Sequence, residues 1–61
     1  MTQMYEIRYY DSEKDKWYKC DEIEIDERLS NVLQMSILRE IVAINKKEQN
    51  GASIKCIKVD Y

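Results

Sequence analysis

The most constraining feature of the sequence is one continuous stretch, residues 27–47, which contains neither glycine nor proline and carries apolar side chains at helical spacing. Asp26 offers an N-cap for this stretch, because its carboxylate can accept backbone N–H groups of the first turn. Asn50 and Gly51 supply a left-handed stop at the other end. The sequence therefore predicts one long helix, over about residues 27–48.

The segments on either side of this helix have the pattern of β-strands. The first alternates cleanly, with Tyr5, Ile7 and Tyr9 on one side, and a wholly polar hairpin loop, residues 11–16, follows it. In the second segment the apolar residues change parity near Asp21, which predicts a bulge at Asp21–Glu22. The third changes parity between residues 56 and 57. The expected strands are residues 4–10, residues 17–25 and residues 53–60.

The order hairpin, helix, strand predicts an α+β fold with a two-layer ββαβ architecture. In the favoured arrangement the sheet is three-stranded and mainly antiparallel, its strands lie in the order 2-1-3, and the helix packs on one face. The alternative order, 1-2-3, would contain one parallel pair. Sixty-one residues form one domain at most, so residues 1–61 are taken as a single domain.

The helix carries two apolar stripes, and one small sheet cannot cover both. The first stripe spans about 120° of the helix and is the predicted core face. The second has the spacing of helix-on-helix packing and predicts a homodimer. In the alternative interpretation the helix rotates to bury one broad face, and one or two large side chains stay exposed. The core stripe is Leu29, Leu33, Ile37, Ile41 and Ile44, and the predicted dimer interface is Asn31, Met35, Leu38, Val42 and Asn45.

A domain of this size is marginally stable by itself and needs a disulfide, a metal or association with another chain. Cys20 and Cys56 are expected to be reduced thiols packed among apolar groups, because no basic and apolar leader precedes them. The chain has no histidine, and two cysteines cannot supply a closed zinc site. We therefore expect that the protein holds no metal and no cofactor, and that association with another chain stabilises it.

The residue types that most enzymes rely on are scarce here. Without histidine there is no Ser–His or Cys–His pair, and with Gly51 as the single glycine there is no glycine-rich phosphate loop. No run approaches the roughly 18 apolar residues of a membrane span. The sequence predicts a non-enzymatic cytoplasmic protein that does not enter a membrane.

Charge and aromatic residues point to recognition of a protein. Residues 1–27 hold nine acidic and four basic side chains, a net charge of −5, whereas residues 28–61 hold three acidic and six basic ones, a net charge of +3. Acidic side chains on a strand are ordinarily a solvated surface that prevents edge-to-edge aggregation, but they also suit docking to a basic partner. Exposed aromatic rings are preferred anchors of protein interfaces. The predicted partner-binding residues are Tyr10, Trp17, Tyr18, Glu22 and Glu24.

Nucleic-acid binding is the alternative function, because aromatic rings on a sheet can also stack on bases. Arg8, Lys55 and Lys58 would have to line one sheet face to hold the phosphates. A third interpretation is a purely structural subunit of a larger assembly. The acidic hairpin favours protein over nucleic acid.

No motif in the chain is specific enough to assign a family. In size, composition and architecture, a small acidic protein without histidine or a catalytic signature resembles the accessory proteins of bacteriophages and mobile elements. This resemblance implies a dimeric protein that inhibits or modulates a larger host or anti-phage defence protein by occupying its surface.

Overall fold

The computed structural model describes residues 1–59, and within them the chain forms three strands and one helix. The predicted strand end at residue 60 and the C-terminal residue 61 lie outside the described part. The elements, in chain order, are β1 (Thr2–Asp11), β2 (Lys16–Asp26), α1 (Asn31–Glu48) and β3 (Ile54–Val59).

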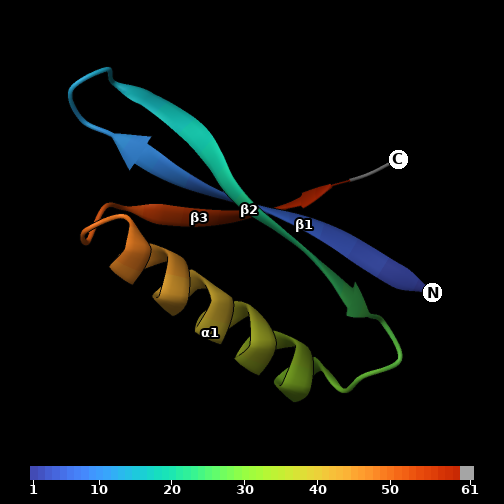
Figure 1. Ribbon diagram of the computed structural model, residues 1–61. Helices are drawn as coiled ribbons and strands as arrows, with labels where there is room; N and C mark the ends of the chain where they lie inside the picture. The colour runs from blue at the N-terminus through green and yellow to red at the C-terminus, as the bar shows by residue number, and fades with distance from the viewer. Residues whose placement is uncertain (60–61) are drawn as a thin grey trace.

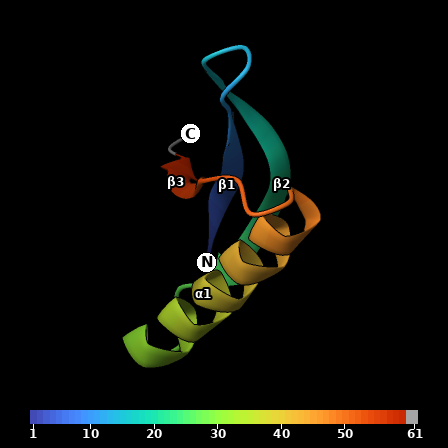
Figure 2. The same cartoon turned by 90° about the vertical axis from the view of Figure 1, so that its left-hand side faces the viewer.

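The predicted α+β fold is confirmed. The strands lie in the order β2-β1-β3, and β1 pairs antiparallel with both neighbours. Figures 1 and 2 show α1 on one side of this sheet, with the tip of the β1–β2 hairpin projecting past the helix. The sheet therefore has a covered face, which packs against α1, and an open face on the opposite side.

The helix begins later than predicted, and Asp26 is not its N-cap. Asp26 still pairs with Thr2 in the sheet, and its carboxylate accepts the Arg28 N–H at 2.9 Å and binds the Arg28 guanidinium. The N-cap is Ser30, whose hydroxyl accepts the N–H of Leu33 at 3.3 Å. The prediction failed because the sequence offers two capping residues, Asp26 and Ser30, and Arg28 binds the carboxylate of the first.

The predicted helix stop is confirmed. Asn50 and Gly51 both have positive φ, at 56° and 82°, and the N–H of Gly51 donates to the carbonyl of Lys46 at 2.8 Å. Left-handed backbone of this kind turns the chain out of the helix and satisfies the last carbonyls. The turn leads directly into β3.

The bulge in β2 lies next to its predicted place. Ile7 pairs with Asp21 but Arg8 pairs with Lys19, so Cys20 is the extra residue. The parity change in β3 has a different origin. The pairing of β1 with β3 is regular, so Cys56 belongs to the covered face and Ile57 to the open face.

The hydrophobic core is thin, and neither of the two predicted apolar stripes of the helix points directly at it. Within residues 1–59 the buried hydrophobic side chains are Ile7 and Ile25. Three members of the predicted core stripe, Leu29, Leu33 and Ile44, are exposed instead. The helix is rotated so that the positions between the two predicted stripes face the sheet. Each stripe therefore lies at one edge of the contact between helix and sheet. The least exposed helical positions, with the residue that follows the helix, are Gln34, Ile37, Leu38, Ile41, Val42, Asn45 and Gln49.

Candidate functional site

The open face of the sheet is the surface on which most of the predicted partner-binding residues meet. Residues paired directly across antiparallel strands point to the same side. The register therefore brings alternate residues of all three strands together on this face. They are Met4, Glu6, Arg8 and Tyr10 from β1, Trp17, Lys19, Glu22 and Glu24 from β2, and Lys55, Ile57 and Val59 from β3.

An aromatic cluster lies at the hairpin end of the open face. Tyr10 and Trp17 are a cross-strand pair whose ring centroids are 5.4 Å apart. The Lys55 ammonium lies 4.2 Å from the centroid of the Trp17 ring, within the range of a cation–π interaction. Trp17 keeps 38% of its surface exposed. The cluster therefore presents a large ring that is fixed in orientation and still open to a partner.

Four charged side chains occupy the middle of the open face and neutralise one another. Arg8 donates to Glu6 at 2.8 Å, and the Lys19 ammonium lies 3.3 Å from Glu22 and 3.9 Å from Glu6. The hydrogen bond from Arg8 lowers the pKa of the Glu6 carboxyl below its usual range. This part of the face is polar without a strong net charge.

The structure brings Tyr10, Trp17, Glu22 and Glu24 together and separates Tyr18 from them. Tyr18 pairs with Tyr9 on the covered face, and the two rings stack with centroids 5.8 Å apart. The bulge at Cys20 sets which of the neighbouring rings faces outward. Lys55 also belongs to the aromatic cluster, but it was not among the residues predicted to bind a protein. Only the register of β3 against β1 shows that its side chain reaches Trp17.

Comparison with known protein families, with curated proteins and with solved structures finds no match. The site must therefore be interpreted from its own geometry. Among residues 1–59, no helix has the length and apolar character required to cross a membrane. In the same part of the chain, no three Asp, Glu or Cys side chains gather in a way that would hold a metal ion.

The basic residues predicted for nucleic-acid binding do not form one surface. Arg8 and Lys55 are cross-strand neighbours on the open face, but Lys58 pairs with Tyr5 and belongs to the covered face. Arg8 is also engaged by Glu6. On the open face Lys55, Arg8 and Lys19 lie beside the aromatic cluster, and Arg8 and Lys19 are both paired with carboxylates.

The five residues predicted for a helix dimer do not share one exposed surface. Asn31 and Met35 are exposed, Leu38 and Val42 are half-buried, and Asn45 is 1% exposed and lies between the helix and the sheet. Asn45 is therefore removed from the candidate dimer interface.

Asn45 instead joins the helix to the bulge of β2. Its amide nitrogen donates to Asp21 at 3.1 Å and to the carbonyl of Ile41 at 2.9 Å. Its amide oxygen accepts from the Cys20 thiol at 3.3 Å. The hydrogen bond from Asn45 makes the largest contribution to lowering the pKa of the Asp21 carboxyl, and the hydrogen bond from the N–H of Glu22 makes the next largest. This polar cluster fixes how the helix sits on the sheet.

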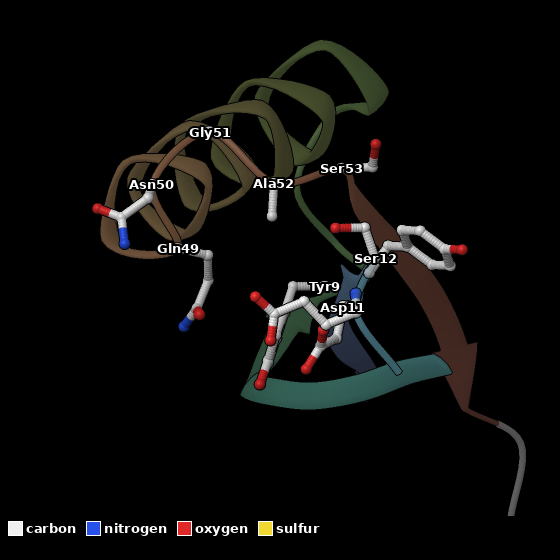
Figure 3. A pocket seen from close by; sticks show the side chains of 10 residues that line it. Tyr9, Asp11, Ser12, Gln49, Asn50, Gly51, Ala52 and Ser53 are labelled. Carbon is white, nitrogen blue, oxygen red and sulfur yellow. Dashed lines mark hydrogen bonds between the residues drawn. The ribbon is translucent and has the colours of Figure 1, made fainter. Parts of the chain in front are cut away.

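An open hollow of about 610 Å³ lies between the β1–β2 turn and the turn that joins α1 to β3. Figure 3 shows Gln49 and Asn50 on one side of it and Tyr9, Asp11 and Ser12 on the other. The Asp11 carboxylate already accepts two N–H groups of its own turn, at 3.0 and 3.3 Å. The hollow is thus lined largely by groups that shape the two turns.

Acid is expected to destabilise the fold. The folded-state pKa values of Glu6, Asp21 and Asp26 are lowered by Arg8, Asn45 and Arg28 respectively. A lowered pKa contributes stability that is present above the unfolded value, near pH 4, and is lost as pH falls through the folded value. The free energy of unfolding, measured by urea titration at several pH values, should therefore decrease below about pH 4.

The Asp21→Asn variant is the control for this pH dependence, because it removes one of the three carboxyls. Its stability should fall less steeply with acid than that of the unchanged chain. Parallel curves for the two proteins would show that the Asp21–Asn45 bond contributes nothing to the acid sensitivity.

Proposed function

We propose that the chain is a non-enzymatic protein-binding module that inhibits or modulates a larger protein by occupying part of its surface. The observation that supports this most directly is the Trp17 ring, held between Tyr10 and Lys55 on a sheet face that the chain itself leaves uncovered. Tryptophan and tyrosine on a rigid support are the side chains that dominate the binding energy of protein interfaces.

The surroundings of Trp17 suit such an interface. The charged side chains beside it pair with one another, so they need not be neutralised by the partner when water is excluded. Glu24 lies farther along β2, where it can meet basic groups of a partner and steer its approach, whereas Glu22 beside it is already paired with Lys19. An aromatic centre with a polar border is the usual anatomy of a specific interface.

The resemblance to phage and mobile-element accessory proteins makes a host or defence protein in the bacterial cytoplasm the proposed target. The two thiols support a reducing compartment. Cys20 and Cys56 are both free, and burial raises the pKa of each thiol, so both stay protonated at neutral pH. Such cysteines act as small packing groups.

Nucleic-acid binding stays the alternative because Lys55 and Arg8 lie beside an exposed ring. Binding of that kind weakens steeply with salt, since phosphate contacts release counterions. A single-stranded oligonucleotide titrated at low and at physiological salt distinguishes the two functions. Protein binding predicts no salt-sensitive complex in that titration.

Replacing Trp17 by alanine is expected to weaken binding to the protein target by about 30-fold or more, since hot-spot truncations cost roughly 2 kcal/mol or more. The target is first captured from host extract with the tagged chain and identified by mass spectrometry. The dissociation constants of its purified complexes with the unchanged chain and the Trp17→Ala variant are then measured by calorimetry.

The matched control is Lys58→Ala, an exposed side chain of β3 on the opposite face. It should leave the affinity unchanged. Equal affinities of the Trp17→Ala variant and the unchanged chain would refute the assignment of the open face, and a complex weakened only by Lys58→Ala would place the interface on the other side of the sheet.

A further inference from the structure

Asn50 and Gly51, which end α1, are also a residue pair that favours loss of the asparagine amide. The backbone nitrogen of the residue after an asparagine can attack the carbonyl carbon of the asparagine side chain, and a glycine obstructs this attack least because it has no side chain. Both residues are exposed, and Figure 3 shows the Asn50 side chain pointing outward from the turn. Within residues 1–59, a Cβ atom placed on Gly51 would meet no atom within 4 Å. The surroundings of the turn therefore leave room for this reaction and for water.

The other two asparagines of the chain are poor sites for the same reaction. Asn31 is followed by Val32, whose branched side chain crowds the nitrogen that would attack. Asn45 is 1% exposed, and hydrogen bonds hold its amide nitrogen and its amide oxygen in place. Asn50 is thus the asparagine at which the chain is open to attack.

The folded turn restrains the reaction at Asn50. The N–H of Gly51 donates to the carbonyl of Lys46 at 2.8 Å. The nitrogen must lose this proton before it attacks, and a negative nitrogen facing a carbonyl oxygen would be repelled by it. The left-handed backbone of Asn50, with φ at 56°, also fixes the Gly51 nitrogen relative to the side chain. The attack therefore requires the last turn of α1 to open, and helix ends open more easily than helix centres.

We propose that Asn50 is a site of spontaneous deamidation, and that the opening of the last turn of α1 sets its rate. In the open turn the Gly51 nitrogen gives its proton to hydroxide and bonds to the side-chain carbonyl carbon of Asn50. The bond from this carbon to the amide nitrogen breaks, and the amide takes a proton from water and leaves as ammonia. Water then opens the resulting cyclic imide at either of its carbonyls. The products are aspartate at position 50 and isoaspartate, in which the main chain runs through the former side chain.

Either product weakens the end of the helix. Aspartate places a negative charge beside the carbonyl end of α1, which already carries a partial negative charge. Isoaspartate adds one carbon to the main chain, which moves the N–H of Gly51 away from the carbonyl that it binds. The same turn leads into β3, where the carbonyl of Ser53 accepts the N–H of Tyr10 at 3.0 Å. The reaction does not depend on the proposed function, since it needs no partner.

Timed incubation of the unchanged chain, folded in buffer and unfolded in guanidinium chloride, tests the site and its control. Mass spectrometry of peptic peptides measures the deamidated fraction at each asparagine, and an isoaspartate-specific methyltransferase detects the second product. We expect conversion first at Asn50 in both states, and at least about tenfold faster in the unfolded chain, which corresponds to an opening free energy of about 1.4 kcal/mol. Equal rates in the two states, or earlier conversion at Asn31 or Asn45, would overturn the proposal.

Lys47→Gly and Lys47→Ala form a matched pair of variants for testing the role of the helix end. Lys47 is exposed in the last turn of α1, and both variants remove the same side chain. Glycine weakens a helix more than alanine does, so the folded Lys47→Gly variant should deamidate about fivefold faster than the folded Lys47→Ala variant. Their rates in guanidinium chloride should agree. Equal rates of the two folded variants would show that the opening of the turn does not control the reaction.

The deamidated chain, separated from the unmodified chain by ion exchange, tests the effect of the products. It should unfold at a lower guanidinium chloride concentration than the unmodified chain, as measured by circular dichroism. An unchanged midpoint would contradict the expected weakening of the helix end.

Discussion

Replacing Ile7 by alanine is expected to unfold a large part of the protein at 25 °C. Ile7 is 0% exposed, lies in the central strand, and pairs with Cys56 on one side and Asp21 on the other. Truncation of a buried isoleucine costs about 2–5 kcal/mol. A domain of this size has roughly 3–5 kcal/mol in total. Circular dichroism and a urea titration of the variant measure the loss directly.

The control for this prediction is Ile57→Ala, which makes the same chemical change on the open face of β3. Because Ile57 is only half-buried, its truncation should cost about 1 kcal/mol and leave the protein folded. If the two variants lost equal stability, Ile7 would not be the centre of the core.

Replacing Asn45 by aspartate is expected to cost about 3 kcal/mol or more at neutral pH, although the two side chains have the same shape. The amide nitrogen that now donates to Asp21 at 3.1 Å would become a second carboxylate oxygen in a buried position. Two carboxylates at this distance cannot both stay ionised without a large penalty. The free energy of unfolding, measured by urea titration at neutral and acidic pH, should therefore recover partly as pH falls.

Two further variants isolate this effect. Asn31→Asp makes the same replacement at the exposed first residue of α1, where a negative charge is favoured by the helix dipole, so it should not destabilise the chain. Asp21→Asn in the Asn45→Asp background restores one carboxylate and one amide and should recover most of the stability. A double variant as unstable as Asn45→Asp would show that the pairing of the two side chains is not what matters.

Most of the fold could be predicted because alternation and helical spacing are local properties. The period-two pattern around Ile7 identified the central strand, and the parity change before Ile23 identified a bulge to within one residue of Cys20. Asn50 and Gly51 ended the helix as expected, because left-handed backbone is encoded by the residues that adopt it.

The orientation of the helix could not be predicted in the same way. Both stripes were apolar enough to face the sheet, and hydrophobicity alone does not choose between them. The choice depends on Asn45, a polar residue that is buried only because the bulge puts Asp21 and Cys20 within its reach. For the same reason Lys55 was not recognised as a neighbour of Trp17, since that contact arises from strand register over a long sequence separation.

The extra residue at Cys20 has a consequence for how such a chain can diversify. Between Cys20 and the hairpin, every side chain of β2 is one step out of phase with the rest of the strand. Regular pairing of the same residues, without the bulge, would place Cys20 opposite Arg8 and Tyr18 opposite Tyr10, which would turn the indole inward and the neighbouring phenol outward. The presence of the bulge, and not the composition of the strand, thus decides which aromatic ring the open face presents, so a change in strand register can alter target preference as effectively as substitution.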